Sequence, residues 1–158
     1  MKYSFERRLI LSLAVLAMTV AVLPELGPVY SRVDQEQRVR DFVEAFNARN
    51  VDAMLELVDE KIQWLTVTGA RLSVEVEGRE ALRQSMGRYF KSCSTCKSSL
   101  ESVQRAGSRV TAMERASWTT KSGPKSQRSL SIYEFSGDKI LRVYYFPAEP
   151  DTRVTGSN

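Results

Sequence analysis

The sequence predicts an α+β domain in which helices pack on one face of a curved sheet. Helical patterns gather near the start of the domain, and strands joined by short turns occupy the rest of it. The predicted order is helix, helix, strand, strand, helix and then four strands, and this segregation is typical of the α+β class. We expect one domain, residues 32–150, between an N-terminal segment, residues 1–31, and a loose polar tail, residues 151–158.

The N-terminal segment has the order of a secretory signal peptide. A basic start, "MKYSFERR", precedes the apolar run Leu9–Leu23, and small and helix-breaking residues follow. The run is shorter than the roughly 20 residues that a spanning helix needs. We therefore expect export to the periplasm or the medium, with cleavage near Ser31. The alternative is an uncleaved signal anchor, which would be the chain's one contact with a membrane.

The first helix is predicted within residues 31–50. Asp34 is the expected N-cap, with Gln37 three residues later as in a capping box. A second helix is predicted over residues 51–60, with Asn50 as its cap. The apolar stripe of the first helix follows a helical period and consists of Val39, Phe42, Val43 and Phe46.

The third helix is predicted over residues 79–90, with Leu82 and Met86 in its buried stripe. Two strands precede it and four follow it, and β-branched residues, alternation and turn residues indicate them. Their ranges are 61–68, 72–76, 97–107, 108–121, 126–135 and 139–147. The sequence "SGPK", residues 122–125, is the expected turn of one hairpin.

A turn at "SGPK" would place Glu114 opposite Tyr133 and Trp118 opposite Ser129. The more apolar face of this hairpin, which includes Glu114, should point at the helices. A carboxylate in an apolar pocket is costly unless it is paired or its pKa shifts. Glu114 is thus either a ligand anchor or acid/base group assisted by Tyr133, or a structural residue near water or beside an arginine.

Aromatic residues supply the other candidates for a pocket wall, although ordinary core packing would explain them as well. Tyr89 on the third helix is one of them. The candidate ligand-binding residues are Trp64, Glu114, Trp118, Ser131, Tyr133 and Tyr145.

The composition excludes several chemistries. The chain contains no histidine, so serine–histidine catalysis, cysteine–histidine catalysis and histidine metal sites are absent. Cys93 and Cys96 are the only cysteines, and a local disulfide is expected in an exported protein, with a redox pair or half a zinc site as alternatives. The sequence predicts no metal site and no cofactor. The net charge of +4 is scattered, which does not favour a nucleic-acid partner.

Three motifs in order resemble the nuclear-transport-factor-2-like superfamily, within its SnoaL-like group. They are "FVEAFNARNVDAMLELVDEKIQW", "VEGREALRQSM" and "YEFSGDKILRVYYF", and together they span about Val39 to Phe146. The resemblance implies a cone-shaped domain, in which a strongly curved mixed or antiparallel sheet wraps three N-terminal helices around an apolar pocket. Members of this fold include isomerases, cyclases, dehydratases and binding domains, so the fold does not give the function.

The residues that its catalytic members use do not match this chain. The steroid-isomerase pattern would place its base at Leu65 or Thr66, its tyrosine at Phe42 and its second aspartate at Ser131. The dehydratase pattern needs histidines, and the epoxide-hydrolase cluster has no match. We therefore expect an exported domain that binds a small, mostly apolar molecule without classical catalysis. The alternatives are an isomerase, cyclase or dehydratase that uses Glu114 and Tyr133, and an interaction module that forms a homodimer through the open sheet face.

Overall fold

The computed structural model describes residues 34–146 and 148–150. All of them belong to one compact unit, Arg32–Asn158. The predicted signal segment, its cleavage point and the polar tail lie outside the described residues.

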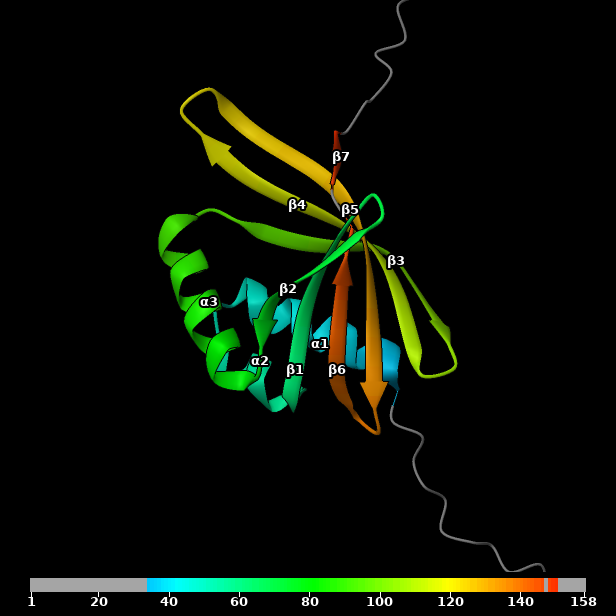
Figure 1. The fold of residues 1–158 in the computed structure, drawn as a ribbon. Helices are drawn as coiled ribbons and strands as arrows, with labels where there is room; N and C mark the ends of the chain where they lie inside the picture. The colour runs from blue at the N-terminus through cyan, green and yellow to red at the C-terminus, as the bar shows by residue number, and fades with distance from the viewer. Residues whose placement is uncertain (1–33, 147, 151–158) are drawn as a thin grey trace, which may run out of the picture. The chain divides into compact units, whose positions relative to one another are not determined.

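The described domain combines three helices with a curved mixed sheet, which confirms the predicted α+β class (Figure 1). Six strands lie in the order β2-β1-β6-β5-β4-β3, and the two-residue strand β7, which the sequence did not predict, pairs with β5. Neighbouring strands are antiparallel except β1 and β6, which are parallel. The elements are α1 Gln35–Asn47, α2 Val51–Glu56, β1 Val58–Thr68, β2 Arg71–Glu77, α3 Arg79–Ser92, β3 Lys97–Ala106, β4 Arg109–Thr120, β5 Gly123–Ser136, β6 Lys139–Tyr145 and β7 Glu149–Pro150.

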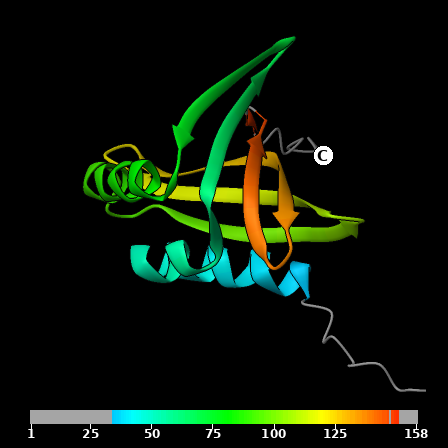
Figure 2. The same ribbon diagram turned by 60° about the horizontal axis from the view of Figure 1, so that its bottom comes forward.

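The helices cover one face of the sheet and one end of it. Helix α1 packs on β3 and β4, while α3 contacts β1, β2 and α2 (Figure 2). The core lies between these layers, and its fully buried members include Val39, Met54, Leu82, Ile140 and Val143. No helix of the described part of the chain is long and apolar enough to cross a membrane.

Helix α1 begins at its predicted cap. Asp34 Oδ1 accepts hydrogen bonds from the backbone N–H groups of Glu36, at 3.0 Å, and Gln37, at 3.3 Å. The predicted capping box is wrong, because the Gln37 side chain donates to Asp41 Oδ1 at 2.8 Å and so serves the next helical turn.

The second predicted helix is too long, because α2 ends at Glu56 and β1 already begins at Val58. Val58 is fully buried and pairs in parallel with Ile140, whose N–H donates to the carbonyl of Leu57 at 3.0 Å. Pairing with a strand far away in the sequence outweighs the local helical pattern, as tertiary context commonly does.

The β4–β5 hairpin turns earlier than predicted. The chain reverses at Lys121–Ser122, and Gly123 follows with φ +106°, as in hairpins where glycine completes a tight turn. The predicted turn over residues 122–125 is therefore wrong. Because the register moves by an even number of residues, the same side chains still face the helices.

The earlier turn also changes the predicted pairs. Glu114 lies opposite Ser129, and Tyr133 lies opposite Val110. Trp118 pairs with Lys125 instead of Ser129. Glu114 and Tyr133 are thus on one face but four positions apart along the hairpin.

Candidate functional site

A cavity of about 300 Å³ lies between the helices and the inner face of the sheet. Most of its wall is apolar or aromatic, as is usual for small-molecule sites. Glu114 is its only charged lining residue within the described part of the chain. The lining residues are Phe42, Val43, Phe46, Trp64, Met86, Tyr89, Ser98, Glu114, Gln127, Tyr133 and Tyr145.

Two hydroxyl groups hold the Glu114 carboxylate in place. Tyr133 Oη donates to Glu114 Oε1 at 2.7 Å, and Ser98 Oγ donates to Glu114 Oε2 at 3.1 Å. A carboxylate has about four lone-pair sites, so acceptor positions remain on both oxygens. The short Tyr133 bond is in the range of charge-assisted hydrogen bonds. The arrangement fixes an anionic acceptor at the cavity wall.

Small residues on the sheet let Tyr133 reach Glu114. On the inner face, the pair Ala112 and Ser131 lies between the Tyr133 position and the Glu114 position. Both side chains are small and buried. Tyr133 and Glu114 are not paired directly across the two strands. The tyrosine ring can still reach the carboxylate, because it can lean along the strands over these two small side chains.

The phenol of Tyr133 stays protonated in this environment. Burial raises the pKa of Tyr133 well above its ordinary value, and the charge and hydrogen bond of Glu114 raise it further. The pKa of Tyr89 is also raised, first by burial and then by Tyr145. The cavity wall thus presents neutral phenols beside one carboxylate.

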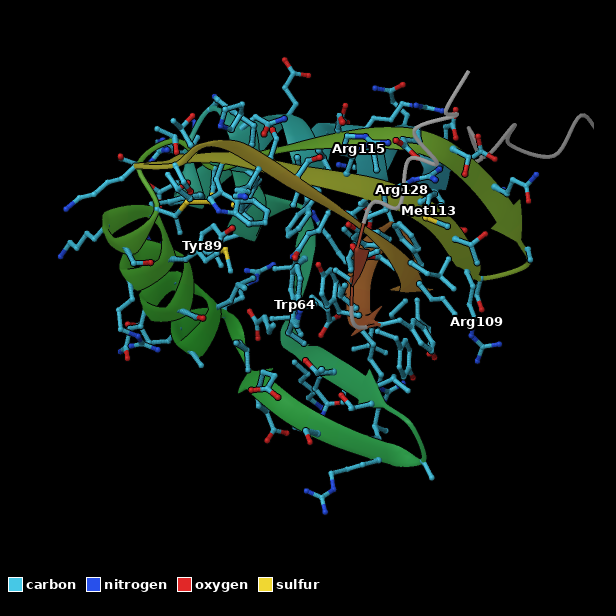
Figure 3. The ribbon with its side chains drawn as sticks, turned by 90° about the horizontal axis from the view of Figure 1, so that it is seen from above. Trp64, Tyr89, Arg109, Met113, Arg115 and Arg128 are labelled. Atoms are coloured by element: carbon cyan, nitrogen blue, oxygen red, sulfur yellow. A yellow bond between two sulfur atoms is a disulfide. The ribbon has the colours of Figure 1, made fainter. Side chains whose placement is uncertain are left out.

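Two groups of aromatic rings border the cavity, and both start from α1. Phe42 lies 6.4 Å from Trp64 and 6.2 Å from Tyr133 between ring centroids. One helical turn further on, Phe46 lies 5.7 Å from Tyr89. Figure 3 shows Trp64 on β1 and Tyr89 on α3, so the rings come from different elements. These separations are typical of favourable aromatic pairs.

The predicted candidates divide into two sets. Trp64, Glu114, Tyr133 and Tyr145 line the cavity. Trp118 and Ser131 are not among its lining residues. Trp118 lies towards the turn of the hairpin, where it pairs with Lys125. Ser131 is buried beneath the wall, and its Oγ has no hydrogen-bond partner among the described residues.

Sequence reasoning missed several wall residues. Phe42, Val43 and Phe46 were predicted as the core stripe of the first helix. Phe42 and Val43 are buried, Phe46 packs against the core, and all three also line the cavity. No local sequence pattern indicates that Ser98 or Gln127 lines a cavity. Ser98 and Gln127 both pair with Ala116, two residues along β4 from Glu114 and on the same face, so only the register of three strands brings them to the site.

The residues at the positions expected from the steroid-isomerase resemblance differ in their relation to the cavity. The β1 residue that lines the cavity is Trp64, while Leu65 is buried in the core. Phe42 lines the cavity but has no donor. The described residues also contain no group of three or more carboxylate or thiol side chains that could hold a metal ion.

A disulfide and an arginine fix the end of α3 that carries Tyr89. Cys93 and Cys96 form a disulfide directly after the helix. The Arg49 guanidinium donates to the carbonyls of Phe90, at 3.1 Å, and Cys93, at 3.3 Å. Arg49 itself has φ 58° at the turn between α1 and α2. These contacts join the helical hairpin to the α3 side of the cavity.

Comparison with known proteins agrees with the fold. A family model described as the SnoaL-like domain matches residues 39–143, which is more than half of the chain. The chain belongs to the SnoaL-like family. No curated protein sequence matches this SnoaL-like chain.

Solved structures show the same fold at low sequence identity. A cystatin-fold protein from Novosphingobium aromaticivorans has a TM-score of 0.63 at 21% identity, and the match covers 72% of this chain and 97% of that chain. A nuclear-transport-factor-2-like protein of unknown function from Burkholderia pseudomallei has a TM-score of 0.60 at 15% identity, covering 74% and 90%. A hypothetical protein with a ketosteroid-isomerase-like fold from Catenulispora acidiphila, described in complex with trimethylamine, has a TM-score of 0.58 at 16% identity, covering 70% and 85%. This fold supports a small-molecule-binding or isomerase-type domain.

Proposed function

We propose that this SnoaL-like protein binds a small, mostly apolar molecule in the cavity between α1, α3 and the sheet. The observation that carries the proposal is the cavity itself, about 300 Å³ with a largely aromatic wall and one fixed carboxylate. A domain that used its helices and sheet only as a packed core would fill this space, because protein interiors are close-packed. The Catenulispora protein of similar fold is described in complex with a small organic molecule, trimethylamine.

A cavity-filling substitution tests the proposal. Met86 lines the cavity from α3, and Met86→Trp should occupy part of the space that a ligand needs. Arg88→Trp is the matched control, because Arg88 is exposed on the same helix and is not a lining residue. Native mass spectrometry of the protein purified from its exported fraction should show a bound small molecule in the wild type and in Arg88→Trp. It should be lost in Met86→Trp that retains its circular dichroism spectrum. An equal ligand load in all three proteins would refute binding in this cavity.

Enzymatic activity is the second candidate function, and the contact between Glu114 and Tyr133 favours it. A carboxylate and a phenol in hydrogen-bond contact at a cavity can transfer protons in an isomerase, cyclase or dehydratase reaction. The molecule recovered by mass spectrometry is the substrate to test. If Glu114 is catalytic, Glu114→Gln should abolish conversion of that molecule while binding persists. Conversion at the wild-type rate by Glu114→Gln would exclude this role.

We also propose export with removal of the N-terminal segment near Ser31. The basic start and apolar run support it, and the Cys93–Cys96 disulfide suits an oxidising compartment. The intact mass of protein isolated from the periplasm or medium tests it. A mass that includes Met1 would contradict cleavage.

A homodimer through the open sheet face is a further proposal. Leu130 is 37% exposed on the side of β5 that faces away from the helices, where Met113 of the neighbouring strand also lies. Light scattering after size-exclusion chromatography should give a dimer mass that falls to the monomer in Leu130→Lys. A monomer mass for the wild type would refute the dimer.

A further inference from the structure

The cavity wall is electrostatically one-sided. Its lining contains one carboxylate, Glu114, and no lysine or arginine among the described residues. The two protein groups that contact this carboxylate, Tyr133 and Ser98, are neutral donors. Among the described residues Glu114 has no ion pair of its own. The charge of the site is therefore negative, and hydrogen bonds alone do not neutralise it.

The strand pattern sends Arg115 and Arg128 to the other side of the sheet. Arg115 follows Glu114 on β4, and successive side chains of a strand point to opposite faces. On that outer face Glu101 contacts Arg115 and Arg128, each at 2.6 Å. Figure 3 shows Arg115 and Arg128 on the hairpin, apart from Trp64 and Tyr89. The charges of Arg115 and Arg128 are thus paired outside the cavity. Lys125 is on the helix side of β5, but it is exposed near the hairpin turn and does not line the cavity.

The rest of the wall offers π faces to a ligand. Its six aromatic residues come from α1, α3, β1, β5 and β6, so they surround the space from several directions. Aromatic faces attract organic cations, and several rings around one space are the usual way in which proteins hold alkylated ammonium groups. The aromatic lining residues are Phe42, Phe46, Trp64, Tyr89, Tyr133 and Tyr145.

These features distinguish between ligand classes. An anionic ligand would meet Glu114 with no compensating cation in the wall. A neutral ligand would cover the carboxylate and remove water from it without supplying a counter-charge, which is costly. A cationic ligand would supply that charge, and its alkyl groups would contact the rings. We propose that the ligand of this cavity is an organic ammonium ion with a mostly apolar body, held by Glu114 and the surrounding aromatic rings.

This inference rests on the proposed binding function, and a matched pair of probes tests it separately. Choline carries a trimethylammonium group, and 3,3-dimethylbutan-1-ol has the same shape with a neutral carbon in place of the nitrogen. Calorimetric titration of the wild-type protein should give a dissociation constant for choline about tenfold lower than for the alcohol, or lower still. This comparison needs no variant and so does not depend on the folding of one.

Two substitutions locate the effect. Glu114→Gln should raise the dissociation constant of choline by about tenfold and leave that of the alcohol nearly unchanged. Glu75→Gln is the matched control, because it removes the same charge from an exposed position on β2 outside the cavity lining. It should change neither constant.

Each contrary result has a defined meaning. Equal or tighter binding of the alcohol, or a choline preference that survives in Glu114→Gln, would overturn the ammonium inference and leave the cavity as a binding site. No binding of choline to the wild type would also overturn it. The proposed function would then still be decided by the mass-spectrometric comparison of wild type with Met86→Trp. A neutral or anionic molecule found in that experiment would overturn the inference while supporting the proposed function.

Discussion

Removing the Tyr133 hydroxyl should destabilise the protein, and the Glu114 carboxylate is the reason. Tyr133 is 1% exposed, and its hydroxyl donates to Glu114 at 2.7 Å. In Tyr133→Phe the ring still fills its place, but Glu114 keeps only the Ser98 hydroxyl, at 3.1 Å, as a protein donor. Hydrogen bonds to charged groups contribute about 1.5–3 kcal/mol, so we expect the free energy of unfolding to fall by about 2 kcal/mol.

A double-mutant cycle assigns this cost to the contact. The four proteins are the wild type, Tyr133→Phe, Glu114→Gln and the double variant, each unfolded in urea and followed by tryptophan fluorescence and circular dichroism. Glutamine can still accept through its amide oxygen, so the coupling energy reports the charge-assisted part of the bond. We expect a coupling of about 1 kcal/mol. A coupling below about 0.3 kcal/mol would equal that of independent sites and refute the reasoning.

A second tyrosine on the other side of the sheet provides the control. Tyr144 Oη donates to Glu134 at 3.0 Å, in a partly exposed contact on the outer face. Glu134 also accepts from Arg142 at 3.2 Å, so it keeps a charged donor when the hydroxyl is removed. Tyr144→Phe should therefore lower the free energy of unfolding by less than about 1 kcal/mol. Equal costs for Tyr144→Phe and Tyr133→Phe would show that burial in the cavity wall has no special effect.

The remaining predictions concern pH, the disulfide and two single side chains. Burial and Glu114 raise the pKa of Tyr133, so above about pH 10 the unfolded state binds fewer protons than the folded state and stability should fall. Urea unfolding across that range should show a shallower fall in Tyr133→Phe. Reducing the Cys93–Cys96 disulfide should lower the free energy of unfolding by about 2 kcal/mol, because the closed loop is short. Thiol labelling should need reductant, and labelling without it would contradict the bridge. Arg49→Ala should lower the free energy of unfolding in urea by about 2 kcal/mol, since it removes donors from the carbonyls at the end of α3. A urea midpoint equal to that of the wild type would refute that role. Ser131→Ala should stay within about 1 kcal/mol of the wild type, because the Ser131 hydroxyl has no partner among the described residues, and a larger loss would reveal one.

The sequence was sufficient for the fold where local patterns and tertiary packing agree. The stripe of α1 that includes Val39 and Phe42 follows the helical period and is buried, and Asp34 caps the helix as predicted. The alternation along β4 placed Glu114 on the helix side of the sheet, and the structure has it there. These features depend on neighbours within one element or one hairpin, so the sequence carries them directly.

The sequence was insufficient where partners are distant along the chain. Val58 continues a helical pattern, yet its pairing with Ile140 makes it a strand residue. Trp118 shares the face of Glu114, but the earlier turn places it opposite Lys125, and it does not line the cavity. Ser98 reaches Glu114 only through the register of β3 on β4, for which no local pattern exists.

The turn of the β4–β5 hairpin therefore helps to determine the chemistry of the cavity. The turn comes earlier than predicted, so each residue of β4 pairs with a different residue of β5. The register differs from the predicted one by an even number of residues, so each side chain stays on its predicted face of the sheet. An odd displacement would have put Glu114 and Tyr133 on opposite faces of the sheet, because directly paired residues share a face. The Tyr133 hydroxyl could then not reach the Glu114 carboxylate, and the cavity would lose the held acceptor on which the proposed ammonium ligand depends. The contact at the centre of the site thus depends on the hairpin register, and Gly123, at the end of the tight turn, is the residue that allows this register.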